Sequence, residues 1–596
     1  MGIPRLIATL EPLAIHRRLQ DETVVVDGPA LAYHVLHVCR RNGITHPSYR
    51  LLGRTVIDWL DELSKQRVVI KAIYFDGYLP VAKQAVRMER MMKSTLQISK
   101  FFAGSPDGCI KAQLVQEKGN VIIDAFLAAT QEVSPFADPS FLVPSIIDAL
   151  RQHPQFEALT HVVPGEADNY CASYVSLHGG TVITSDSDLL VHNLGAGQVV
   201  FFRDLHRNPD SSIFGASYSP SEICQQLELS PSVGLARLAY ERKQLSHASL
   251  PQIMRACSQP APDQERYQAF CQQYRNNASE FHLRVMANSS YCIMIFDPRI
   301  SELYVQLAQL STNVTEDPDF VQIYLPVLVE CPNRTSAWEH STTIRQLAYT
   351  VLASTTPTRL TMHTHILEYR RVQSTLQKGR KIALTSAADV DRSAQDLLDL
   401  MERIRGISNG SGTYWVMLHL ALDARECRQQ DKESHAWWTF HQRLNSSEIT
   451  ASRSISWDII HLVSQIHATC YSLRMLQQVL SHALERSTES VSPNLGQLQM
   501  ALTDMSSLSN FPDIDLVVDL LTTPSHSKLA NALADCLNLR APAQRAPRIG
   551  YRGSFKMIKS ANEKATGKRP NDDSTKPWSD FNNLATNNMF SLLSVD

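Results

Sequence analysis

The chain has 596 residues, of which 43% are hydrophobic and 19% charged, and its formal net charge is −2. This composition is typical of roughly two to four globular domains, and it excludes a uniformly basic coat for nucleic acid while leaving room for a local basic groove. The 11 cysteines are scattered without a C-x-x-C pair, so their spacing indicates neither a zinc site nor a disulfide framework. We expect buried thiols in a reducing compartment.

The first residues, "MGIPRLIATLEPLAIHRRLQDE", contain early acids and no continuous apolar core, which argues against a secretory signal. Leu6 stands where an N-myristoylation motif requires Ser or Thr. No apolar run approaches the ~18 residues of a membrane span. We therefore expect a nuclear or cytoplasmic protein that is neither secreted nor bound to a membrane.

The first ~240 residues alternate β-rich runs with helical stretches, a pattern that predicts a mainly parallel α/β sheet. The predicted strands cover residues 23–28, 68–77, 160–166, 180–186 and 198–202. Between the third and fourth of these, "NYCASYVSLHGG" predicts a helix that ends at Gly179 and Gly180. Residues 161–190 would thus form a strand–helix–strand unit that brings its two flanking acidic pairs side by side.

From residue 245 onward strand signals become sparse and helical patterns dominate, for instance over 387–407 and over 456–487, the latter one helix or a helix pair. We predict an α/β domain over 1–245, a mostly helical region over 246–540, and a basic tail over 541–596. The tail is short of large aliphatic residues, which predicts disorder. Its end, "NNMFSLLSVD", is either a frayed terminus or a peptide that docks on a protein partner.

Acidic side chains follow the predicted strands. The six carboxylates are, in chain order, Asp27, Asp76, Glu166, Asp168, Asp186 and Asp188. The carboxyl ends of parallel strands share one edge of a sheet, where ligands bind in open α/β folds. So many carboxylates oppose one another's ionisation unless cations neutralise them, and oxygen ligands suit Mg²⁺ or Mn²⁺. Two such ions would stabilise the attacking and leaving oxygens of a phosphodiester displacement.

Each acidic piece also has a simpler interpretation when taken alone. "DG" after a strand is usually a turn, "GEAD" is typical of a helix N-terminus, and "SDSD" of an N-cap. The coincidence of acids at four successive strand ends favours a metal site over these separate interpretations.

A basic stripe follows Asp76, because Lys83, Arg87 and Arg90 are spaced i, i+4 and i+7. The spacing alone favours a solvated face, whereas a neighbouring metal cluster favours phosphate binding. Core positions on the same helix are predicted at Ala85, Met88, Met92 and Leu96.

Together these residues resemble the flap endonuclease/XPG superfamily of PIN-like nucleases. "MGIPRL", "VVVDGPALAYHVLH", "YFDGYLPVAKQAVRMER", "GEADNYCA" and "VITSDSDLL" are similar to successive motifs of that family, over roughly residues 1–205. The resemblance implies a PIN-like fold and an endonuclease acting on branched or flapped DNA. It also implies metal-ligand roles for the six acids and phosphate contacts for Lys83 and Arg87.

The residues that follow resemble the asteroid branch of this superfamily, as found in fungi. "FDPRISEL" (296–303) and "IYLPVLVECPNRTSAWEHSTTIRQLAY" (323–349) carry this likeness to about residue 350.

Two departures from the family pattern bear on catalysis. The family's "G-x-D-Y" motif, which supplies a further metal carboxylate and grips duplex DNA, is missing where "LSPSVGLARLAYERKQLS" (229–246) stands. Glu241 could substitute for that carboxylate, although a surface position on a helix is the simpler expectation. The segment over 100–133 also carries fewer clustered cations than a threading arch would need.

The motifs suggest three different functions. The first is a Mg²⁺- or Mn²⁺-dependent, structure-specific nuclease, and the second is a catalytically weakened scaffold that binds nucleic acid or protein. The third, a nucleotide-sugar transferase with a D-x-D motif, requires one acidic pair and does not explain Asp27 and Asp76. A phosphatase of the D-x-D-x-T type is excluded because Leu190 stands where Thr is required.

Overall fold

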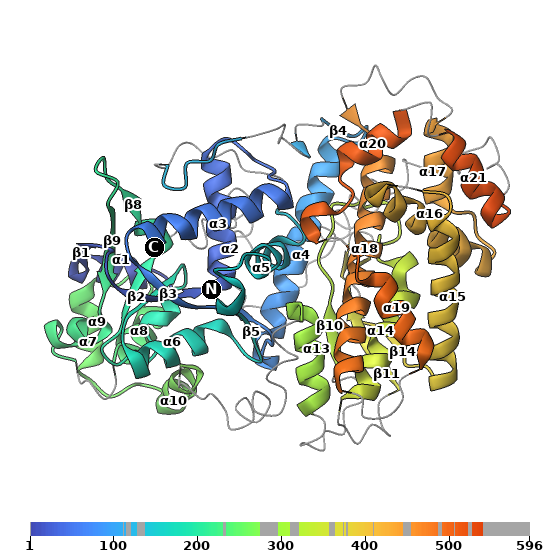
Figure 1. Ribbon diagram of the computed structural model, residues 1–596. Coiled ribbons are helices and arrows are strands. Elements are labelled where there is room, and N and C mark those ends of the chain that lie inside the picture. Colours follow the sequence, from blue (N-terminus) through green and yellow to red (C-terminus); the bar gives the residue numbers. More distant parts are fainter. Residues whose placement is uncertain are drawn as a thin grey trace, which may run out of the picture.

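A computed structural model gives the fold of the chain (Figure 1). The structure describes residues 2–110, 113–114, 121–127, 137–229, 234–274, 296–309, 321–356, 364–372, 375–376, 379–408, 410–444, 454–486, 492–505, 507–522 and 527–539. The tail predicted to be disordered, with its proposed docking peptide, lies outside these residues. The domain boundaries at 245 and 540 stay predictions.

The N-terminal half contains one sheet in the order β1-β9-β7-β6-β2-β3-β5, with β8 added beside β9. Its strands are β1 (Ile15–Arg18), β2 (Thr23–Asp27), β3 (Val69–Asp76), β5 (Thr160–Val163), β6 (Thr181–Thr184), β7 (Gln198–Phe201), β8 (His206–Arg207) and β9 (Ile213–Tyr218). The five predicted strands are all present, and β7, β6, β2, β3 and β5 run parallel to one another. The antiparallel strands β1, β8 and β9 were not predicted. The expected α/β class with a mainly parallel sheet is confirmed.

The predicted strand–helix–strand unit over residues 161–190 is present. The strands β5 and β6 that flank the predicted strand–helix–strand unit are not neighbours, because β2 and β3 lie between them. Local pattern predicts each strand, but strand order depends on pairing between distant segments of the chain. The connecting helix α6 (Ala167–His178) therefore crosses the sheet, and it contacts β2, β3 and β6.

Helices cover both faces of this sheet, and the alternation of side chains along β2 shows how the faces divide. Val24 and Val26 belong to a core with α2 (Gly28–Arg41), α3 (Tyr49–Lys65) and α5 (Leu142–Arg151). Val25 points the other way, into a core with α6 and α8 (Ala236–Gln244). A strand buried on both faces needs a continuous apolar run, which "TVVVD" supplies. The remaining helices of this half are α1 (Leu6–Leu10), α4 (Gln84–Gly104), α7 (Pro220–Gln226), α9 (Leu250–Cys257) and α10 (Gln264–Gln273).

The second half is mostly helical, as expected, and it packs beside α4 and α5 (Figure 1). Its helices are α13 (Pro298–Gln309), α14 (Thr342–Thr355), α15 (Ala387–Arg405), α16 (Ser411–Gln429), α17 (His435–Leu444), α18 (Trp457–Arg486), α19 (Pro493–Leu502), α20 (Ile514–Thr522) and α21 (Ser527–Leu537). The segment 456–487 forms the single long helix α18, not a pair. Arg474 of α18 donates to Asp148 of α5 over 3.0 Å and so ties the halves together.

A small sheet inside this helical half was not predicted. It has the order β10-β11-β14, and further two-stranded pairs are β12–β13 and β4–β15. The bounds are β4 (Cys109–Ile110), β10 (Gln322–Tyr324), β11 (His365–Tyr369), β12 (Arg371–Val372), β13 (Thr375–Leu376), β14 (Arg380–Ala383) and β15 (Ser454–Ile455). The strands are short, and charged residues interrupt their apolar pattern. One of these, Glu368, is buried against Arg345 with both side chains 0% exposed.

Within the described residues, no helix combines the length and the apolar character that crossing a membrane would require.

Candidate acidic site

The six predicted acids gather at one edge of the sheet, because β6, β2, β3 and β5 are adjacent and parallel. Asp27 and Asp76 are the last residues of β2 and β3. Glu166 precedes the first residue of α6, and Asp186 precedes the 3₁₀ turn over Ser187–Leu190. The second member of each pair, Asp168 or Asp188, lies in the first turn of the helix that follows the strand.

Thr184 links two of the acids. The Thr184 hydroxyl donates to Asp27 Oδ2 over 2.6 Å. Its oxygen, Thr184 Oγ1, in turn accepts from the backbone N–H of Asp186 over 2.9 Å. The other oxygen of Asp27 caps α2 by accepting from Ala30 N over 3.2 Å. The carboxylate of Asp27 is therefore fixed at both oxygens, and its side chain is buried.

Backbone and phenol groups hold two further acids. Asp76 Oδ1 accepts from the backbone N–H of Ala167 over 2.7 Å, which joins the end of β3 to the start of α6. The Tyr274 hydroxyl donates to Asp188 Oδ2 over 3.2 Å. The other oxygen of Asp188 is buried and has no hydrogen-bond partner in the described part of the chain. Such an unpaired carboxylate oxygen is a ready ligand for a cation.

Burial and mutual repulsion act on these carboxylates. Burial raises the pKa of Asp27 to about 7, with Asp76 and Asp186 adding to the rise. Burial likewise raises the pKa of Asp188 to about 7 and that of Asp76 to about 6. For Asp168, burial and the charges of Asp27, Asp186 and Asp76 raise the pKa well above its usual value. The carboxylates are thus close enough to oppose one another's ionisation.

The donor set fits a hard divalent cation, because it consists of carboxylate oxygens with one lysine nearby. The oxygens are nevertheless spread: among the residues described, no three of the six acids offer oxygens that all lie within 4.8 Å of one another. The hydrogen bonds from Thr184, Ala167 and Tyr274 hold individual carboxylates in separate positions.

The predicted phosphate-binding cations lie in three different settings. Lys83, at the end of a 3₁₀ turn before α4, makes an ion pair with Glu166 and remains 44% exposed. Arg87 makes a two-pronged ion pair with Glu302 of α13, at 2.6 and 2.8 Å. Arg90 is exposed. Lys83 therefore borders the acids, whereas Arg87 is engaged with the helical half.

The face of α4 that packs inward differs from the prediction. Met91, Thr95 and Ile98 are buried, on the same side as Arg87, whose guanidinium also lies 4.8 Å above the Tyr324 ring. Of the predicted core positions, Ala85 is exposed, Met88 is half-buried, and Met92 and Leu96 are 48% and 47% exposed. Apolar residues occur on two faces of this helix. The buried face is the one from which Arg87 makes its ion pair with Glu302.

Residues 138–384 match the family model described as XPG domain containing. The chain is similar to Asteroid homolog 1 of Schizosaccharomyces pombe, with 23% identity over 449 residues that cover 71% of this chain and 76% of that protein. The resemblance to the XPG superfamily and its asteroid branch is confirmed. These two matches support a nuclease-type, PIN-like protein.

Among solved structures, the chain is also similar to the catalytic core of Rad2 in complex with a DNA substrate. The identity is 15%, the match covers 43% of this chain and 67% of that one, and the TM-score is 0.25.

Three neighbours of the acids were not identified from sequence. Thr184 sits within the quoted "VITSDSD" motif, but hydroxyls in strands are common and give no signal. Tyr274 is distant in the chain and offers none. Gly2 is so close to the site that an added Cβ would lie 2.1 Å from Ser187 Oγ and 3.3 Å from Asp186 Oδ1. A larger residue there would force the Ser187 side chain to move, and the "MGI" opening, which resembles that of XPG-type proteins, is the signal that points to this position.

Glu241, considered as a substitute for the missing XPG-type aspartate, is placed otherwise. It is 4% exposed on α8, and its carboxylate bonds to Arg237 one turn away at 2.7 Å. It is therefore neither the expected surface residue nor a carboxylate unpaired for a metal. A buried glutamate needs a charge partner, and Arg237 supplies it.

Proposed function

We propose that this chain is a divalent-metal-dependent, structure-specific endonuclease that hydrolyses phosphodiester bonds in branched or flapped DNA. The observation that carries the proposal is a set of carboxylates, Asp27 buried and the others half-buried, that four adjacent parallel strands bring to one edge; the pKa values of Asp27, Asp76 and Asp188 are raised to about 7, 6 and 7. A fold stabilised by apolar burial tolerates such a cluster only where a ligand compensates it.

The residues that would hold two Mg²⁺ or Mn²⁺ ions are Asp27, Asp76, Glu166, Asp168, Asp186 and Asp188. When bound, the ions supply neutralising charge for the phosphodiester and lower the pKa of water. The unpaired Asp188 oxygen and the raised pKa values support this assignment over a purely structural role for the acids.

The chain's own groups orient the ligands and the substrate. Thr184 holds Asp27 and Asp186 in register, and Tyr274 sets the direction of the Asp188 carboxylate. Lys83, exposed at the rim and paired with Glu166, can exchange that carboxylate for a phosphate oxygen. In this way it would position the scissile phosphate and balance its charge. Arg90, exposed on the same helix, would contact the backbone further along.

A second candidate is a weakened nuclease that serves as a scaffold for nucleic acid or protein. Two observations favour it. Arg87 is occupied by Glu302, so it does not reach a phosphate in this arrangement, and Glu241 does not replace the missing family aspartate.

Cleavage assays on labelled flap, fork and single-stranded substrates separate the two functions. With Mn²⁺ or Mg²⁺, the nuclease cuts the flap or fork and the Asp186→Ala variant does not. A scaffold binds the flap without cutting it in either metal, and replacing Glu166 and Asp168 by Ala leaves its binding unchanged. Full cleavage by Asp186→Ala would contradict the metal-site assignment.

A further inference from the structure

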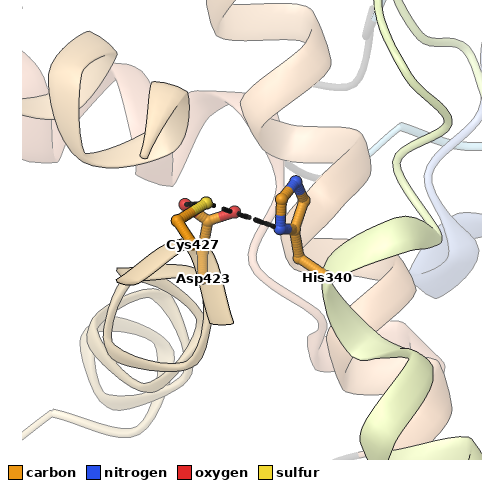
Figure 2. Close-up of side chains that lie close together, drawn as sticks. All are labelled: His340, Asp423 and Cys427. Carbon is orange, nitrogen blue, oxygen red and sulfur yellow. Dashed lines mark hydrogen bonds and ion pairs between the residues drawn. The ribbon is translucent and has the colours of Figure 1, made fainter. Parts of the chain in front are cut away.

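A second cluster of ligand-type side chains lies in the helical half, remote in sequence from the acidic site. It comprises His340, in the 3₁₀ turn over Glu339–Ser341, and Asp423 and Cys427, one turn apart on α16 (Figure 2). Each offers one ligand atom, and these atoms all lie within 4.8 Å of one another. This is the group of three with that property in the part of the chain that the structure describes.

The distances within the cluster resemble the edges of a coordination tetrahedron. His340 Nδ1 lies 3.2 Å from Asp423 Oδ1 and 3.8 Å from Cys427 Sγ, and Cys427 Sγ lies 4.0 Å from Asp423 Oδ2. Tetrahedral Zn²⁺ with its usual bond lengths separates nitrogen from oxygen by about 3.4 Å and sulfur from either by about 3.6 Å. The three contacts differ from these separations by about 0.4 Å or less. They use both oxygens of Asp423, Oδ1 toward His340 and Oδ2 toward Cys427, so a small rotation of this carboxylate would bring one oxygen onto the ion.

A catalytic Cys–His–Asp relay does not describe the same atoms. In such a relay the imidazole contacts the nucleophile with one ring nitrogen and the carboxylate with the other. Here the carboxylate and the thiol both approach Nδ1 of His340. Donor atoms that converge on one point, and do not form a chain, are typical of metal ligands.

One buried nitrogen on the same helix, Nε2 of His419, lacks a hydrogen-bond partner among the described residues, and the contact that Asp423 Oδ1 makes there is the 3.2 Å approach of His340 Nδ1. His419 is 1% exposed and stands one turn before Asp423 on α16, so His419, Asp423 and Cys427 share a helix face. The second carboxylate oxygen, Asp423 Oδ2, accepts from the Ser434 hydroxyl, which would orient it as outer-shell partners orient metal ligands.

We propose that His340 Nδ1, one Asp423 oxygen and Cys427 Sγ bind a single Zn²⁺ ion, and that His419, one turn before Asp423 on α16, is a candidate for the fourth ligand. A mixed nitrogen, oxygen and sulfur donor set selects Zn²⁺ over Mg²⁺ or Ca²⁺. The carboxylate and a metal-bound thiolate balance the charge of the ion, which suits side chains as buried as Asp423 (1%) and Cys427 (4%).

The ion would have a structural role, because the cluster is enclosed. It would fasten the turn that precedes α14 to the middle of α16, two elements that lie far apart in the chain. The cysteine spacing gave no sign of it, since only one cysteine takes part and its partners come from segments some eighty residues apart in sequence, with His340 and Cys427 separated by 87 positions.

Cobalt substitution tests the site with the full chain. Co²⁺ added to the metal-free protein should give a thiolate-to-cobalt charge-transfer band in the near ultraviolet together with intense tetrahedral visible bands. The carboxylates of the acidic site cannot give the thiolate band, so the readout is independent of the proposed nuclease. Elemental analysis of the purified protein should find close to one zinc per chain.

Matched variants assign the band to the cluster. Cys427→Ser should abolish it and lower the thermal midpoint of the zinc-loaded protein, whereas Cys470→Ser, at an equally buried cysteine on α18, should keep the band. The proposal is overturned if the wild-type chain gives no thiolate band, or if Cys427→Ser keeps it. The wild-type spectrum by itself can overturn the proposal, so the test still applies if a variant fails to fold.

Discussion

Replacing Asp188 by Asn should stabilise the metal-free protein at alkaline pH. Burial, with Asp186 as the largest neighbouring charge, raises the pKa of Asp188 from 3.8 to about 7 in the folded chain. The folded state then binds a proton more tightly than the unfolded state, so stability falls as pH rises from about 4 to about 7. Above that window the penalty is fully present, and an amide at position 188 removes it.

The size of the effect follows from the shift. One pKa unit corresponds to about 1.4 kcal/mol, and a rise of about 3 units gives about 4 kcal/mol as the largest value. Because Asp188 is partly exposed and shares its shift with neighbouring carboxylates, we expect a gain of about 2–4 kcal/mol at pH 8 and almost none at pH 4. The amide oxygen still accepts from Tyr274, so the packing is preserved.

Thermal unfolding with chelator, at pH 4 and pH 8, measures this difference. Asp389→Asn is the matched control, because the Ser386 hydroxyl lowers the pKa of that exposed carboxyl and the substitution should therefore destabilise slightly. A loss of stability in Asp188→Asn at pH 8, or a gain equal at both pH values, would refute the account of a repulsive acidic cluster.

Two further substitutions test one residue in each half of the chain, Lys83 beside the acidic site and Arg345 in the helical half. Lys83→Ala should slow flap cleavage by roughly 10²-fold in single-turnover assays, with a smaller effect on DNA affinity, because Lys83 is proposed to act on the scissile phosphate. Lys100→Ala, at an exposed position near the end of α4, should cleave at the wild-type rate. Equal rates for the two variants would contradict the role of Lys83. Arg345→Ala removes the two-pronged partner of the buried Glu368 and leaves it Tyr349 and a 3.7 Å contact to Arg370. Chemical denaturation should show a loss of about 3–5 kcal/mol, and a loss below 1 kcal/mol would contradict this account.

The acidic site could be predicted from sequence because its signals are local. Runs such as "TVVVDG" and "VITSDSD" show both the buried strand and the acid that follows it. The parallel arrangement then places these acids at a common edge, whatever the strand order. This explains why Asp27, Asp76 and Asp186 lie together although β5 and β6 turned out to be separated by two strands.

What was missed depends on contacts between distant segments. Nothing near Arg87 in the sequence indicates Glu302, yet that pair occurs on the buried side of α4. Tyr274 reaches Asp188 from 86 residues away for the same reason. The strand β11 was overlooked because it is short and because Glu368, buried against Arg345, interrupts its apolar pattern.

Manganese binding followed by electron paramagnetic resonance tests the central claim most directly. The signal of free Mn²⁺ should fall when wild-type protein is added, through binding to the carboxylates at the strand edge. Asp186→Asn should weaken this binding by at least tenfold, while Cys427→Ser, in the remote cluster, should leave it unchanged. Equal Mn²⁺ affinity in the wild type and Asp186→Asn would contradict the assignment of the acidic cluster as the metal site of a nuclease.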